Sequence, residues 1–199
     1  PKKAKDVGGF SYSYSSSGTA QSEVQHLWDA KTGKAVSTLF KGKEGGWRFD
    51  SERTTFAFAP DGSHLLTVNK TEQMPTLYRT ADGKEVRTFR ATSRWGGPAA
   101  VGLSPDGQTV LVEKQSELAL YDAATGIHFA TLKDFPGSVR DFAYSPNGKR
   151  LAVASYKAAF VYDMPDRKLV SVLRGHSAEV TTVAFSPDGS RVLTGAADD

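Results

Sequence analysis

A short segment that ends in a proline turn recurs four times, and it constrains the fold more than any other feature of the chain. Each copy carries apolar residues two positions apart, which indicates a strand with one buried face. Each ends in Pro-Asp-Gly or Pro-Asn-Gly, which favours a tight turn because proline fixes φ and glycine accepts positive φ. The copies are residues 56–62, 101–107, 142–148 and 183–189. Their spacing of 41 to 45 residues is typical of a repeat architecture.

The complete repeats contain three further segments with strand character. The proline turn is followed by a β-rich segment, and then by a segment that ends in an aromatic residue such as Tyr121. After a polar turn comes a segment in which apolar and polar residues alternate, such as 129–132. This pattern predicts four short antiparallel strands per repeat and no helix. Upstream, strands are predicted over 24–29 and 35–40. An alternating aromatic pattern predicts another strand over 9–16.

Composition excludes several classes of site and partner. The 199 residues include no cysteine, which excludes disulfides and thiolate metal sites. No apolar run approaches the roughly 20 residues needed to cross a bilayer, so we expect no membrane partner. The net charge of +3 is small and spread along the chain, whereas nucleic-acid binding usually needs a concentrated basic face. We therefore expect no nucleic-acid partner. The compartment stays undetermined, with the cytoplasm favoured.

The motifs of the repeats resemble those of the WD-repeat family of β-propellers. The matching motifs are Gly175-His176 before the fourth copy, Leu27-Trp28-Asp29, Tyr121-Asp122 and Tyr162-Asp163. The resemblance covers about residues 9–199, and residues 1–8 are interpreted as a basic leader or linker. It implies an all-β propeller of four-stranded WD-type blades, with three complete blades and partial blades at both ends. Because one fold hosts many functions, the resemblance says little about activity.

The resemblance also implies a hydrogen-bonded tetrad of His, Ser or Thr, Asp and Trp within a blade. Counted from each proline, only the last repeat combines His176, Thr194 and Asp198. The tryptophan in a matching context is Trp28, near the other end of the sequence. We therefore predict a split blade with a Velcro closure, in which the strands over 24–29 and 35–40 join the last repeat and Trp28 completes the tetrad.

Three arrangements of the ends stay open at this point. In the first, the sequence is a piece of a longer propeller. In the second, two chains self-associate by pairing their ends. In the third, the chain closes on itself as four blades, at the low end of the usual range of about 4–8. A strand over 9–16 would duplicate the place already filled by 192–198, which favours the first arrangement.

The sequence offers no constellation typical of catalysis, cofactor binding or metal binding. The histidines have no metal-ligand spacing. The segment 102–105 superficially resembles a nucleophile elbow around Ser104, but its second glycine comes one residue late and no helix is expected after it. No glycine-rich phosphate loop precedes a helix. We therefore expect no catalytic residue, no cofactor and no metal, and predict that the protein is not an enzyme.

Protein binding is the predicted function, in a scaffold or interaction module. In WD propellers the loops that enter the innermost strands share one rim, where partners often dock. Here these loops carry aromatic and basic residues, namely Trp47, Arg48, Arg94, Trp95, Phe135 and Arg140. Trp and Arg are enriched at interface hot spots. One alternative is that the tryptophans pack structurally and that Phe135 fills the same place at the blade edge as His176. Another is that the chain is a sensor or regulatory propeller of a larger enzyme or transporter.

Overall fold

The computed structural model describes residues 24–41, 56–69, 74–90 and 100–198. The secondary structure of these residues consists of β-strands, and neighbouring strands pair antiparallel. Since that part of the chain holds no helix, it holds none that could span a membrane. The leader predicted at 1–8 and the strand predicted at 9–16 lie outside the described residues.

Three sheets have four strands each, paired in the order in which they occur in the chain. The first contains β3 (Phe56–Phe58), β4 (His64–Asn69), β5 (Met74–Arg79) and β6 (Glu85–Thr88). The second contains β7 (Val101–Leu103), β8 (Thr109–Lys114), β9 (Glu117–Asp122) and β10 (His128–Leu132). The third contains β11 (Val139–Tyr144), β12 (Arg150–Ser155), β13 (Ala158–Asp163) and β14 (Lys168–Arg174).

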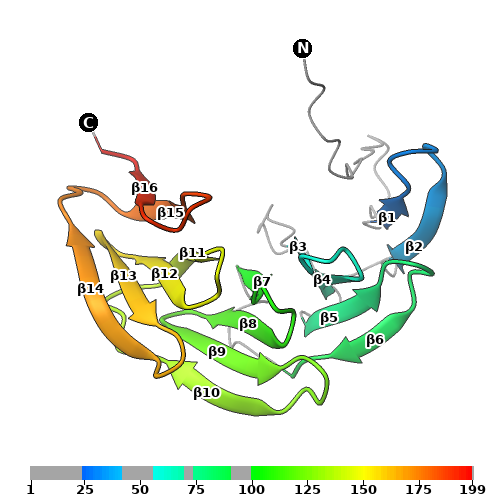
Figure 1. Cartoon of the computed structure of the whole chain (residues 1–199), viewed down its shortest axis with the longest axis horizontal. Helices are drawn as coiled ribbons and strands as arrows, with labels where there is room; N and C mark the ends of the chain where they lie inside the picture. Colours follow the sequence, from blue (N-terminus) through cyan, green and yellow to red (C-terminus); the bar gives the residue numbers. More distant parts are fainter. Residues whose placement is uncertain (1–23, 42–55, 70–73, 91–99, 199) are drawn as a thin grey trace, which may run out of the picture.

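A two-stranded sheet lies at each end of this series. One contains β1 (Val24–Trp28) and β2 (Ala35–Lys41), and the other contains β15 (Val180–Phe185) and β16 (Val192–Ala196). Figure 1 shows the five sheets following one another around an open arc, with β3, β7, β11 and β15 on its inner side and β6, β10 and β14 outside. The predicted fold class is confirmed: three complete four-stranded blades, with a partial blade at each end.

The hydrophobic core lies between the blades, because the central strands of a blade are covered on both faces. In β8, Val110 and Val112 pack with Leu66 and Phe89 of the preceding blade. Leu111, between them in sequence, packs with strands of the following blade. All three of these β8 residues are fully buried. Alternate side chains of one strand therefore belong to two different cores, as the period of two in a strand requires. Each blade depends on its neighbours for burial.

The recurring turns owe their shape to a local hydrogen-bond pattern. In three copies a serine precedes the proline, and its Oγ accepts the backbone N–H of the residue five positions later: Thr109 to Ser104 at 2.9 Å, Arg150 to Ser145 at 2.9 Å and Arg191 to Ser186 at 3.0 Å. The glycine of each turn has φ of 71°, which other residues rarely adopt. Ser104, the serine of the elbow-like segment, is therefore engaged in a strand-connecting turn.

A polar contact and a close apolar contact join the innermost strands of neighbouring blades. Oδ2 of Asp141 in β11 accepts hydrogen bonds from the backbone N–H of Val183 at 2.9 Å and from Oγ1 of Thr182 at 3.0 Å, both in β15. Gly102 in β7 lies against Phe142 in β11, so that a Cβ at position 102 would come within 2.6 Å of the ring. Both contacts join the innermost strands of adjacent blades.

Candidate functional site

The rim at which the innermost strands begin is built by a backbone contact that recurs between blades. The N–H of Val139, the first residue of β11, donates to the carbonyl of Gln115 at 2.7 Å. The N–H of Val180, the first residue of β15, donates to the carbonyl of Tyr156 at 2.6 Å. Gln115 and Tyr156 belong to the short turns that connect the central strands of the preceding blade. These turns and the strand starts therefore form one continuous edge.

Arg140 and Glu179 form an ion pair on this edge. Nε of Arg140 donates to Oε1 of Glu179 at 2.8 Å, and the two side chains are 44% and 41% exposed. This hydrogen bond, with the negative charges of Glu179 and of Glu113 in β8, holds the pKa of Arg140 above its ordinary value. An ion pair this exposed is typically worth only about 0.2–1 kcal/mol. A partner could therefore replace either member of this ion pair with little loss in the free energy of unfolding of the chain.

Tyr156 lies on the same edge and is absent from the set of rim residues predicted from sequence. It is 51% exposed, and its backbone has φ of 53°, an uncommon conformation for a bulky residue. Tyr156 lies close to Gly137: a Cβ added at Gly137 would be 3.3 Å from the Cβ of Tyr156. Nζ of Lys157 lies 5.9 Å from the Tyr156 ring centroid, within the range of a cation–π contact. Nothing in the local sequence marks this tyrosine as exposed.

Two of the predicted rim residues, Arg140 and Phe135, lie in the described part of the chain and differ in their exposure. Arg140 lies on the rim with an exposed side chain, as described above. Phe135 does not: it is 7% exposed and packs edge-to-face on Phe160 and Tyr162, with ring centroids 5.6 and 6.0 Å away. Its assignment as a partner-binding residue is therefore corrected, since its ring fills the core between two blades. The other predicted rim residues, Trp47, Arg48, Arg94 and Trp95, lie outside the described residues.

A hydrogen-bond network ties down the loop that enters β15. His176 Nε2 and Thr194 Oγ1 are 2.8 Å apart, and His176 Nδ1 contacts Oδ2 of Asp198. Oδ1 of Asp198 accepts the backbone N–H of Ala178 at 2.6 Å. The hydrogen bond with His176, followed by that from Ala178, holds the pKa of Asp198 below its ordinary value. The structure thus brings together three of the four predicted tetrad residues.

Trp28, the predicted fourth member, is not part of this network. It belongs to β1, which pairs with β2 among the described residues and lies at the opposite end of the arc from β15 and β16 (Figure 1). Its ring contacts His26, with centroids 5.9 Å apart, and its side chain is partly exposed. The prediction that β1 and β2 join the last repeat in one blade is therefore corrected for this single chain.

The described residues offer few other candidates for chemistry. Over residues 24–41, 56–69, 74–90 and 100–198, no three His, Asp or Glu side chains gather in a way that could hold a metal ion. A charged pocket also lies between β6 and β9–β10. The rim around Arg140, Tyr156 and Glu179 is therefore taken as the candidate functional site.

Comparison with known proteins agrees with this architecture. Residues 167–199 match the family "WD domain, G-beta repeat" (WD40). No curated protein matches the sequence. Among solved structures, a chain of Kuenenia stuttgartiensis hydrazine synthase is similar, with a TM-score of 0.68 and 18% identity over 86% of this chain and 49% of that one. This chain thus spans about half the length of that structure, and the likeness concerns the fold. Residues 167–199 thus match a WD40 repeat, and the blades of the described residues have a β-propeller-like arrangement.

Proposed function

We propose that this chain is a non-catalytic protein-interaction module and that its partner docks on the rim around Tyr156. A WD40 repeat suggests a scaffold role in protein interactions. The observation that carries the proposal for this site is the half-exposed Tyr156, which stands beside an exposed arginine–glutamate pair. Tyr and Arg are among the residue types enriched at interface hot spots, where they supply much of the binding energy.

The backbone around Tyr156 supports its role as an anchor. A non-glycine residue in a sparsely populated conformation costs roughly 1–3 kcal/mol and persists only where the surroundings hold it. Here the carbonyl of Tyr156 accepts the N–H of Val180 at 2.6 Å, which ties the turn to the next blade. The ring is therefore presented by a fixed backbone. Fixing a side chain before binding reduces the entropy that association would otherwise cost.

The charges beside Tyr156 support recognition of a polar partner surface. Arg140 contributes a planar group that can bind a carboxylate through two parallel hydrogen bonds. Its present partner, Glu179, is itself half-exposed, so a partner carboxylate could replace it without leaving a buried charge unpaired. Glu179, once released, would be free to pair with a basic group of the partner. Charge pairs of this kind contribute mainly to specificity and to the rate of association.

The test compares the wild-type chain with a rim variant that carries Tyr156→Ser and Arg140→Gln. Proteins captured from a lysate of the native cell by each chain are quantified, and any that prefer the wild type are purified for titration. We expect at least one partner whose affinity falls by about tenfold or more in the rim variant. Lys149→Gln is the matched control, because Lys149 is exposed in a turn at the other end of the strands.

Two outcomes would contradict the proposal. One is a purified partner that binds the rim variant and the wild type equally, which would place the interface elsewhere on the propeller. The other is equal loss of affinity in the rim variant and in Lys149→Gln, which would indicate a nonspecific effect of charge. Light scattering on the same samples shows whether the captured partner is a second copy of this chain.

A further inference from the structure

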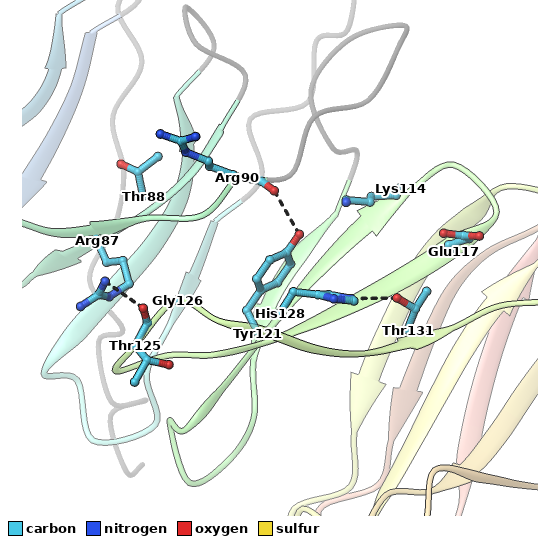
Figure 2. A pocket seen from close by; sticks show the side chains of 10 residues that line it. All are labelled: Arg87, Thr88, Arg90, Lys114, Glu117, Tyr121, Thr125, Gly126, His128 and Thr131. Carbon is cyan, nitrogen blue, oxygen red and sulfur yellow. Dashed lines mark hydrogen bonds between the residues drawn. The ribbon is translucent and has the colours of Figure 1, made fainter.

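A pocket of about 490 Å³ opens between β6 of one blade and the outer strands β9 and β10 of the next. Figure 2 shows its lining, with Arg87 and Arg90 on the side of β6 and with Tyr121 and His128 on the opposite side. Lys114 and Glu117 line the end nearest the β8–β9 turn. The volume lies within the range of about 300–1,000 Å³ that is typical of small-molecule sites, and it exceeds what a bare inorganic ion fills.

The lining carries more positive than negative charge. Three cationic side chains, Arg87, Arg90 and Lys114, face one carboxylate, that of Glu117. Among the described residues none of the three takes part in an ion pair. Glu117 pairs in register with Lys114 across the β8–β9 hairpin, so its charge offsets that lysine first. The arginine end of the pocket has two positive charges and no acid in the lining; outside the lining, the charge of Arg87 helps to lower the pKa of Asp122.

Arg87 is anchored in the pocket wall and keeps unused hydrogen-bonding capacity. Its Nη1 donates to the carbonyl of Thr125 at 3.0 Å. Its buried Nε has no hydrogen-bond partner within the described part of the chain. The neighbouring acid, Asp122, already accepts the backbone N–H and the hydroxyl of Thr125 at 2.7 and 2.6 Å. A buried donor without an acceptor is rare in native structures, so the guanidinium of Arg87 is not saturated by its protein contacts. Because Arg87 lines the pocket, a bound anion would meet the donors of this group that Thr125 does not use and that are not buried.

The wall opposite the arginines is aromatic and rigid. The Tyr121 ring is buried and meets Phe89 and His128 edge-to-face, with centroids 5.8 and 5.3 Å apart. Its hydroxyl donates to the carbonyl of Arg90 at 3.2 Å, and Nε2 of His128 lies 2.8 Å from Oγ1 of Thr131. These contacts hold two rings beside the charged end, as Figure 2 shows. An uncharged, planar part of a ligand would lie mainly against the exposed His128, which the buried Tyr121 supports.

We propose that this pocket binds a small organic anion, with a carboxylate or phosphoryl group at Arg87 and Arg90 and an uncharged body along Tyr121 and His128. Arginine suits such a group because its planar fork matches the geometry of carboxylate and phosphate oxygens. The pocket lies on the outer part of two blades and shares no residue with the rim around Tyr156. The inference therefore stands independently of the proposed function.

The experiment titrates the ¹⁵N-labelled chain with three probes of similar shape. Phenyl phosphate and benzoate carry the two candidate anionic groups, and benzyl alcohol is the uncharged control. Amide shifts of Thr88, Thr125 and Gly126 report on the pocket. We expect saturable shifts there with one or both anions at concentrations up to about 10 mM and none with benzyl alcohol. The stronger of the two anions identifies the preferred group.

Variants then assign the binding to the named residues. Arg87→Gln and Arg90→Gln are each expected to weaken anion binding by about tenfold, because each removes one charge-assisted contact. Both arginines are tested because the side chain of Arg87 packs on Gly126, so that Arg87→Gln could unfold the chain. Arg90→Gln then still tests the proposal. Glu117→Gln should tighten binding, because it removes the negative charge from the lining. Arg174→Gln, an equal charge change on an exposed residue of β14, should leave the affinity unchanged.

The proposal is overturned if neither anion shifts the three reporter amides. It is equally overturned if benzyl alcohol saturates the same amides, or if Arg174→Gln weakens binding as much as Arg90→Gln does. Tighter binding in Glu117→Gln together with weaker binding in Arg90→Gln supports the proposal. Unfolding or aggregation of a variant would lower the affinity for the anion in both cases and would not raise it in one.

Discussion

Oδ2 of Asp141 accepts the backbone N–H of Val183 at 2.9 Å and so joins the innermost strands of two neighbouring blades. The same oxygen accepts Oγ1 of Thr182 at 3.0 Å, and Oδ1 accepts the N–H of Phe142 at 2.9 Å. The carboxylate therefore fixes β15 against β11 through two hydrogen bonds, and the third, from its neighbour Phe142, orients it on its own strand. Because each blade buries its apolar faces only against its neighbours, such a contact between blades acts directly on the stability of the array.

Asp141→Ala should destabilise the chain by about 1–3 kcal/mol, because the partly buried N–H of Val183 loses its acceptor. Asp141→Asn retains an acceptor oxygen and should cost less. Urea unfolding followed by circular dichroism measures both. Equal midpoints for the wild type and Asp141→Ala would show that this contact contributes nothing to the folded state.

Ala59→Ser should stabilise the first recurring turn. Position 59 holds alanine where the other three turns hold a serine whose hydroxyl accepts a backbone N–H. Adding the hydroxyl should supply the same acceptor and raise the free energy of unfolding by about 0.5–1.5 kcal/mol. Ser104→Ala is the reciprocal change and should lower it by a similar amount. The idea fails if both variants shift thermal unfolding in the same direction.

Gly102→Ala should destabilise the contact between the second and third complete blades. The added Cβ would lie 2.6 Å from the Phe142 ring, and overpacking of this kind typically costs about 1–3 kcal/mol. Replacing the ring with a smaller side chain should relieve the clash, so that Gly102→Ala costs less in a Phe142→Leu background. A double-mutant cycle by chemical denaturation measures this coupling. A coupling of zero would mean that the two residues do not meet.

His176→Phe should raise the pKa of Asp198 toward its ordinary value of 3.8, because the hydrogen bond with His176 is the largest cause of the lowered pKa. A carboxylate whose folded-state pKa is lowered stabilises the fold above its unfolded pKa, and this contribution is lost as pH falls through the folded pKa. The wild type should therefore lose stability more steeply than the variant as pH falls below the ordinary aspartate pKa of 3.8. Carboxyl ¹³C shifts of Asp198 over this range check the pKa directly, and an unchanged titration would rule out the assignment.

Much of the fold was predictable because it depends on interactions that are local in sequence. Turn chemistry and an apolar period of two located the strands of each repeat, and counting from the prolines grouped His176, Thr194 and Asp198. These three residues belong to one repeat, so their contact follows from the hairpin that β15 and β16 form. The regular spacing of the turns then gave the number of complete blades.

Packing between blades decided what the repeat pattern could not. Phe135 and Arg140 lie five positions apart in one loop and strand start, yet the ring is buried and the guanidinium is exposed. Tyr156 is exposed in a turn that has positive φ and whose carbonyl is hydrogen-bonded to the next blade. Trp28 lies away from His176 because β1 and the loop that enters β15 stand at opposite ends of the arc.

The sequence by itself determined the strands, their turns and their grouping into blades, since each of these depends on residues within one repeat. The tertiary structure alone decided the contacts between repeats, namely the hydrogen bonds of Asp141, the rim around Tyr156 and the charged pocket beside Arg87. The physical reason is that alternate side chains of a strand face different neighbouring blades. Their environment is therefore set by how those blades stack, which the order of residues within one repeat does not specify.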